Sequence, residues 1–210
     1  ENTGVLYYKL GLAFYGGMYV KKDLNKAIRF ITLSANQNNS DAQSMLGMIL
    51  YTEQKEPRDI NKTIKYLKMS ADQDHSEAQY TLGMIYLHGN VVPRDINKAI
   101  KYLTKSADQN NPLAQYELGK IYYGGKYIYR DMNKAIHYLT LSASQNNPDA
   151  QCDLGLLFLC GEFIPQDINK GIDYLTLSAD QNHSEAQCRL GMTYSTNCYV
   201  PQNMNKAIHY

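Results

Sequence analysis

A strict internal repeat constrains this chain more than any other feature. Leu-Gly pairs recur every 36 residues without insertion or deletion. An Asp followed two and three places later by Asn-Lys keeps the same step, and so do Ser-Ala and Ala-Gln pairs. A fixed period of this size indicates stacked copies of one supersecondary unit. The repeated glycines are Gly11, Gly47, Gly83, Gly119, Gly155 and Gly191, and the repeated acidic column is Asp23, Asp59, Asp95, Asp131 and Asp167, with Asn203 in the sixth copy.

The copy at 76–111 predicts two helices, of which we call the first helix A and the second helix B. Ser76 and Gln79 have the spacing of a capping box, which predicts Ser76 as the N-cap of helix A. Apolar residues then follow at helical spacing, and Gly89 lies where a helix C-cap needs a positive φ. The equivalent positions hold Gly17, Glu53, Gly125, Gly161 and Asn197, and Glu53 departs from the pattern.

Helix B is expected to follow Asp95, whose carboxylate suits an N-cap. The preceding Val92-Pro93 favours an extended connector. Asn110 is expected to end the helix, because Asn enters the left-handed region easily. The equivalent positions hold Asn38, Asp74, Asn146 and Asn182. Each repeat is therefore predicted to be a helix-turn-helix unit.

Small residues predict how the two helices of a repeat meet. A glycine such as Gly83 in mid-helix costs about 1 kcal/mol relative to alanine, and this cost recurs in every copy. We expect close packing to offset it, with helix B approaching the backbone of helix A. Ala27, Ala99 and Ala135 provide the small residue on the other side.

The combined pattern, A-x-x-x-L-G-x-x-Y-x-x-G and then D-x-x-K-A-x-x-(aromatic)-x-x-x-A, resembles the Sel-one-like repeat (SLR) family. The aromatic after Lys-Ala or its equivalent is Phe30, Tyr66, Tyr102, Tyr138, Tyr174 and Tyr210. The resemblance implies an all-α fold, a right-handed α/α superhelical solenoid of 36-residue helix-turn-helix repeats similar to tetratricopeptide repeats. It also implies protein–protein interaction, often as an adaptor. One departure is the turn after helix B, where Asn or Asp replaces the family's usual Gly.

This reading predicts a single solenoid over residues 1–210. Its repeats are expected at approximately 4–39, 40–75, 76–111, 112–147, 148–183 and 184–210, the last one partial.

Composition argues against several other functions. The 21 Lys and Arg residues nearly balance the 20 Asp and Glu residues, which leaves a net charge of +1 and no strong field for nucleic acid or membrane. No apolar run is long enough to cross a bilayer. No catalytic triad, phosphate-binding loop or C-x-x-C metal motif appears, so we expect no enzyme, cofactor or metal site. The repeated lysines follow the capping residue by three positions, and that residue is an Asp in every copy except the sixth. They are interpreted as structural: Lys26, Lys62, Lys98, Lys134, Lys170 and Lys206.

The positions of the cysteines indicate whether the chain resides in an oxidising or a reducing compartment. All four occur late in the chain, at Cys152, Cys160, Cys188 and Cys198. A cysteine-rich branch of the resembled family joins each repeat by a disulfide, but the partner positions here hold residues such as Ala143. We therefore expect free thiols and a reducing compartment, the cytoplasm or another.

Helix A carries the candidate binding surface. If the stack resembles tetratricopeptide repeats, helix A lines a concave face, and three of its columns are rich in Tyr, Met, Leu and Cys although the repeat pattern does not need them. Such side chains suit a binding surface for a peptide or protein. The alternative is that curvature packs these columns between adjacent A helices. The candidate partner-binding residues are Tyr8, Tyr15, Met48, Tyr51, Tyr80, Met84, Tyr116, Tyr123 and Met192, with Asp41 and Glu77 in an acidic rim that favours a basic ligand.

Two rival functions remain open at this point. The chain opens into helix A at Val5-Leu6 without a polar cap and stops within a helix B, which would suit a structural subunit that self-associates end to end through its repeat ends. A hydrolase is suggested for some cysteine-rich relatives, but the missing disulfide partners and the missing nucleophile cluster count against it.

Overall fold

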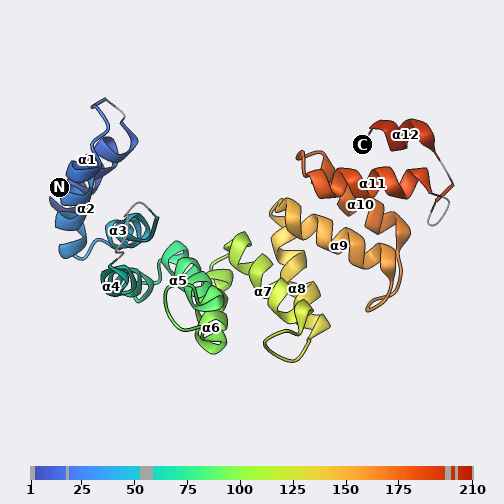
Figure 1. Ribbon diagram of the computed structural model, residues 1–210, viewed down its shortest axis with the longest axis horizontal. Helices are drawn as coiled ribbons and strands as arrows, with labels where there is room; N and C mark the ends of the chain where they lie inside the picture. The colour runs from blue at the N-terminus through green and yellow to red at the C-terminus, as the bar shows by residue number, and fades with distance from the viewer. Residues whose placement is uncertain (1–2, 18, 53–58, 197–199, 202, 210) are drawn as a thin grey trace. The chain divides into compact units, whose positions relative to one another are not determined.

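The computed structural model describes residues 3–17, 19–52, 59–196, 200–201 and 203–209, which form twelve α-helices and no strand (Figure 1). The prediction of an all-α fold of helix-turn-helix repeats is confirmed. The helices are α1 (Thr3–Gly16), α2 (Leu24–Asn36), α3 (Ser40–Thr52), α4 (Ile60–Ala71), α5 (Ser76–His88), α6 (Ile96–Asp108), α7 (Pro112–Gly124), α8 (Met132–Ser144), α9 (Pro148–Cys160), α10 (Ile168–Ala179), α11 (Ser184–Ser195) and α12 (Met204–His209).

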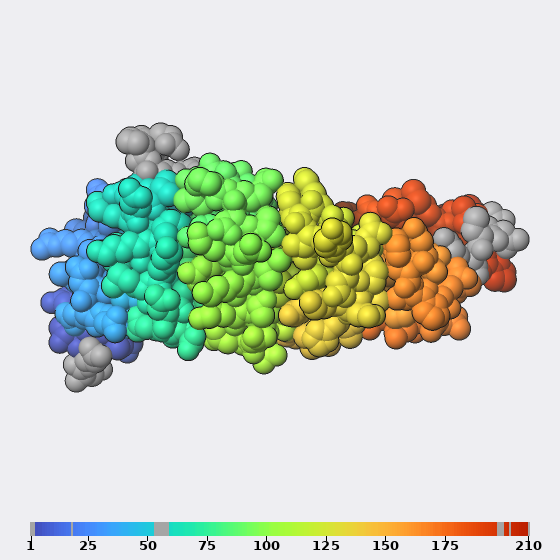
Figure 2. Space-filling model, turned by 90° about the horizontal axis from the view of Figure 1, so that it is seen from below, coloured from blue at the N-terminus to red at the C-terminus, as the bar shows by residue number. Residues whose placement is uncertain are grey.

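The contacts divide the chain into two compact units. Unit 1 spans residues 1–111 and contains α1 to α6, and unit 2 spans residues 112–210 and contains α7 to α12. Inside each unit, each helix packs on the helix that follows it in the chain. Figure 2 shows the result within each unit as neighbouring bands of colour that follow the order of the repeats.

Asp residues cap the B helices as the repeat predicts. In α6 the Asp95 carboxylate accepts a hydrogen bond from the backbone N–H of Lys98 at 2.9 Å, and it forms an ion pair with the Lys98 amine at 2.9 Å. The same backbone hydrogen bond recurs at Asp23, Asp59, Asp131, Asp167 and Asn203. The cap satisfies one of the amide groups that a helix N-terminus leaves unpaired.

The N-cap of helix A differs from the prediction. His75, not Ser76, caps α5, because its Nδ1 accepts from the backbone N–H of Ala78 at 3.3 Å. The Ser76 hydroxyl is engaged elsewhere, 3.0 Å from the Ser106 hydroxyl on α6. The predicted capping box is therefore wrong, and the Gln79 amide donates instead to the Ala71 carbonyl at 3.1 Å. His183 caps α11 in the same way.

The turns adopt the expected left-handed backbone. Gly89 has a φ of 69°, and Asn110 has a φ of 62°. Positive φ is also found at Gly17, Gly125, Gly161, Asn38, Asp74, Asn146 and Asn182. The departing Glu53 and the Asn197 position lie outside the described residues.

The mid-helix glycines allow helix A and helix B of a repeat to approach closely, as their unfavourable helix propensity led us to expect. A Cβ added to Gly83 would lie 2.7 Å from Leu103 Cγ and 3.3 Å from the Leu103 backbone nitrogen. Leu103 is fully buried. Gly83 on α5 therefore lets a large apolar side chain of α6 fill the space that its own side chain would take.

Two polar columns join the helices, a role that the sequence analysis missed. The Ser106 hydroxyl donates to the Ser76 carbonyl at 2.8 Å, and the Gln109 amide donates to the Gln79 side-chain carbonyl at 2.7 Å. Because Gln79 also donates to Ala71 at the end of the preceding repeat, one amide side chain links three segments. The glutamine pair recurs as Gln43 with Gln73, Gln115 with Gln145, and Gln151 with Gln181.

Candidate binding surface on the A helices

In unit 1 the first two predicted residues are half-buried. Tyr8 and Tyr15 on α1 pack against the core cluster that contains Ile31 and Leu46. Burial, together with the negative charge of Asp41, raises the pKa of the Tyr8 phenol. These two tyrosines therefore contribute to packing between repeats as well as to the surface.

The other predicted residues of unit 1 differ in exposure. Met48 on α3 is 37% exposed, whereas Tyr51, Tyr80 and Met84 are half-buried. A partner could therefore contact only part of each of these side chains, because the rest is buried within unit 1.

The predicted acidic rim is also engaged within unit 1. Asp41 is exposed, but its carboxylate lies 3.2 Å from Nε2 of His75, the last residue of the same repeat and the N-cap of α5. Glu77 is half-buried on α5. The rim carboxylate of Asp41 thus links α3 to the start of α5 through the histidine that caps α5.

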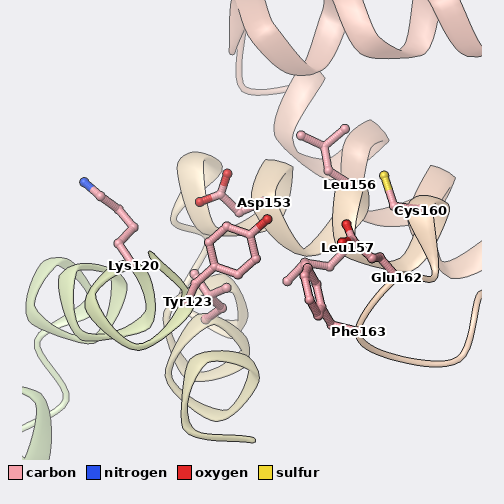
Figure 3. A pocket seen from close by; sticks show the side chains of 9 residues that line it. Lys120, Tyr123, Asp153, Leu156, Leu157, Cys160, Glu162 and Phe163 are labelled. Carbon is pink, nitrogen blue, oxygen red and sulfur yellow. The ribbon is translucent and has the colours of Figure 1, made fainter. Parts of the chain in front are cut away.

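In unit 2 the structure brings two predicted residues to one pocket region. Tyr123 on α7 is 40% exposed and lines a pocket of about 140 Å³ (Figure 3). Tyr116, about two helical turns earlier on the same helix, is half-buried and does not line the pocket. The pocket is lined by Lys120, Tyr123, Leu139, Asp153, Leu156, Leu157, Cys160, Glu162 and Phe163.

A carboxylate with unusual surroundings lies in this pocket. Asp153 on α9 accepts a hydrogen bond from the Tyr116 hydroxyl. Removal from water raises the pKa of the Asp153 carboxyl, while that hydrogen bond and the Lys120 charge oppose the rise. Burial and the neighbouring carboxylates raise the pKa of the Tyr116 phenol. The Asp153 carboxyl is thus largely removed from water, and its hydrogen-bond donor is the uncharged Tyr116 hydroxyl.

Lys120 lies near this pair, but its amine forms an ion pair with Glu117 and not with Asp153. The Lys120 amine lies 3.0 Å from the Glu117 carboxylate and 4.8 Å from the centre of the Tyr116 ring. In Figure 3 this amine points away from Asp153 and from the aromatic rings of the pocket. Lys120 therefore lines the pocket with its aliphatic stem.

Two aromatic rings, those of Tyr123 and Phe163, also line the pocket. Tyr123 and the loop residue Phe163 pack edge to face, with ring centres 6.2 Å apart. The guanidinium of Arg130 lies 4.9 Å from the Phe163 centre and 5.7 Å from the Tyr123 centre. The chain itself thus places an arginine against this aromatic pair, an arrangement that cation–π attraction stabilises.

A second, apolar pocket of about 250 Å³ adjoins the first. The two share Leu156 and Cys160 of α9, and the second pocket reaches Met192 of α11, which is 54% exposed. Arg189 on its wall is held by Glu185 at 2.7 Å. The A helices α7, α9 and α11 therefore contribute to two adjoining pockets within unit 2.

The thiols of unit 2 divide by exposure. Cys152 is buried, and burial raises its pKa to about 12. Cys160 and Cys188 are exposed, and all three are free thiols. Cys198 lies outside the described residues.

The sequence analysis missed Asp153 and Phe163. Asp153 falls in a column with no common chemistry, which holds Lys9, Met45, Thr81, Glu117, Asp153 and Arg189. Phe163 falls in a loop column that is mostly aromatic and could have been noticed, with Tyr19, Lys55, Val91, Tyr127, Phe163 and Tyr199.

The residues that the structure describes contain neither a membrane-spanning helix nor a cluster of metal ligands. No helix in this part of the chain is long and apolar enough to cross a membrane. Nor do three or more His, Cys, Asp or Glu side chains gather there into a group that could hold a metal ion.

Comparison with known proteins settles the family. The family model of the Sel1 repeat matches residues 6–39, 40–75, 76–111, 112–147, 148–183 and 184–210. The chain belongs to the Sel1 repeat family. Sel1 repeat proteins are generally scaffolds for protein interaction. A comparison with curated proteins gives no match.

Solved structures agree with this assignment of the Sel1 repeat chain. A Sel1 repeat protein from Oxalobacter formigenes matches 100% of this chain and 86% of its own, at 25% identity and a TM-score of 0.89. The predicted solenoid fold class is therefore confirmed.

Two more distant structures show the fold alone. An immunity protein from Pseudomonas aeruginosa matches 100% of this chain and 80% of its own, at 18% identity and a TM-score of 0.57. Cysteine rich protein B from Helicobacter pylori matches 63% of this chain and 95% of its own, at 19% identity and a TM-score of 0.50.

Proposed function

We propose that this chain is a non-catalytic scaffold that binds a peptide or protein segment along the exposed surface of its A helices. The observation that carries the proposal is the pair of adjoining pockets in unit 2, which share Leu156 and Cys160. The general role of Sel1 repeat proteins in protein interaction supports it.

The proposed anchors are the large side chains that remain open on this surface. Tyr123 and Met192 are 40% and 54% exposed at the two ends of the paired pockets. Aromatic and thioether side chains bury much area and adapt to a partner. A true interface hot spot is worth about 2 kcal/mol or more. In unit 1, Met48 is the most exposed of the proposed Tyr and Met residues and would serve in the same way.

Capture of partners from the native lysate tests this proposal. We would compare the wild-type chain with the double variant Tyr123→Ser/Met192→Ser, because both side chains are substantially exposed and polar replacements should leave the fold intact. Tyr116 is a less suitable target, since its hydroxyl holds Asp153.

The matched control is Leu177→Ser on α10, whose side chain is 50% exposed on a B helix. The double variant should lose the proteins that the wild type retains, while Leu177→Ser should keep them. If the double variant retains the same proteins at the same level, the A-helix surface is not the binding site. Helical circular dichroism of all three chains would establish that folding is unchanged.

A further inference from the structure

We propose that the pocket formed by α7, α9 and the loop after α9 is a subsite for an arginine side chain of the peptide partner. This inference rests on the proposed function and adds the chemistry of one anchor residue. Its elements are the carboxylate of Asp153, the carboxylate of Glu162 and the rings of Tyr123 and Phe163.

Charge complementarity favours an arginine side chain in this pocket. Asp153 is withdrawn from water, and among the described residues it has no ion-pair partner, only the neutral Tyr116 hydroxyl as donor. The Lys120 charge lowers the cost of burying this carboxylate but forms no ion pair with it. A guanidinium could form two parallel hydrogen bonds with the carboxylate. Lys120 does not fill this role, because its amine is bound to Glu117.

The remaining charges near the pocket also allow a cation. Glu162 is exposed at the rim and adds a second negative charge. Arg130 lies on the aromatic pair but does not line the pocket. The lining thus has two carboxylates and one lysine, and that lysine is already paired.

The aromatic rings of Tyr123 and Phe163 also favour a guanidinium. A guanidinium is planar and weakly hydrated, so it stacks on aromatic rings better than an ammonium does. Arg130 provides the example within this chain, 4.9 Å from the centre of Phe163. A pocket of about 140 Å³ with apolar walls at Leu156 and Leu157 accommodates a side chain of this size rather than a larger ligand.

The neighbouring apolar pocket extends the pattern. Because it shares Leu156 and Cys160 with the arginine subsite, a segment that places arginine in the first pocket can place an apolar side chain against Met192 in the second. The expected ligand is therefore an extended segment with an arginine close to an aliphatic residue.

An NMR titration with small probes tests the subsite without knowledge of the partner. N-acetyl-arginine methylamide should shift amide signals of residues 160–163 in the wild-type chain. The matched probe N-acetyl-citrulline methylamide has nearly the same shape without the charge, and it should bind at least tenfold more weakly. Equal shifts from the two probes would overturn the proposal.

Variants give the second arm of the experiment. Asp153→Asn retains the acceptor for Tyr116 and should weaken arginine binding about tenfold. Glu162→Gln at the exposed rim should weaken it about twofold without a risk to folding. The control is Asp173→Asn on α10, an exposed carboxylate, which should bind as the wild type does. Unchanged binding by Asp153→Asn and Glu162→Gln would refute the subsite.

The two proposals fail separately. If the arginine probe does not bind but Tyr123→Ser/Met192→Ser still abolishes partner capture, the subsite is wrong and the scaffold function stands. If capture is independent of the A-helix surface, the proposed function fails even if the small probe binds.

Discussion

Gly155 offers a stringent test of how the helices of a repeat pack. A Cβ at this position would lie 2.7 Å from Leu175 Cγ and 2.9 Å from the carbonyl oxygen of Gly171 on α10. The leucine can rotate, but the carbonyl can withdraw only if α9 and α10 move apart. Gly155→Ala should therefore disturb the hairpin itself rather than one side chain.

The expected magnitude follows from two opposing effects. Replacing a mid-helix glycine by alanine gains about 1 kcal/mol in helix propensity. Overpacking a closed core costs about 1–3 kcal/mol and more where backbone must shift. Because a backbone atom is among the clashing groups, we place Gly155→Ala at the upper end and expect a net loss of about 2 kcal/mol. Gly83→Ala meets mainly the movable Leu103 side chain and should lose less.

The assay is urea denaturation followed by circular dichroism, with hydrogen exchange of the α9 and α10 amides as the local measure. Gly124→Ala is the matched control in the same unit, because a Cβ there has no atom within 4 Å, and it should leave stability unchanged or raise it by up to about 1 kcal/mol. If Gly155→Ala unfolds at the same urea concentration as the wild type, or loses no more than Gly124→Ala, the close-approach argument is wrong.

Three further changes test other features of the packing and the pocket. Thr63→Ala should stabilise the chain by about 1 kcal/mol in thermal unfolding, because the buried Thr63 hydroxyl has no hydrogen-bond partner among the described residues; a loss of stability would contradict this. Asp153→Asn should stabilise the chain at pH 7, and its advantage should disappear as the pH falls towards 3.8, the ordinary carboxyl value. The reason is that a raised pKa in the folded state makes the acid lose stability as the pH rises through that pKa; a constant difference across pH would refute it. In iodoacetamide at pH 8, mass spectrometry should find Cys160 and Cys188 alkylated and Cys152 protected until urea is added, because Cys152 is buried and its pKa is raised to about 12. Rapid labelling of Cys152 in the folded chain would show that its burial is wrong.

Features that depend on residues close together in the chain were predictable from the amino-acid sequence. Asp95 caps α6 through the amide three residues later, and Gly89 closes α5 with a positive φ. These interactions are complete within one turn of backbone, so the same residue types produce them again at Asp23 and Asp131 and at Gly125 and Gly161. The glycine of the Leu-Gly pair predicted close helix contact, because its low helix propensity has to be offset by favourable packing against a neighbouring helix.

The features that join one helix to another depend on the tertiary structure. Ser76 has the spacing of an N-cap, yet its hydroxyl lies 3.0 Å from the Ser106 hydroxyl on α6, and His75 caps α5 instead. Asp153 meets Tyr116 although 37 positions separate them. The repeat positions of Asp153 and Tyr116 hold different residue types in different copies, so the 36-residue period does not predict their contact. Only the packing of α7 and α9 in the folded chain brings the carboxylate, the phenol and the aromatic rings together at one pocket.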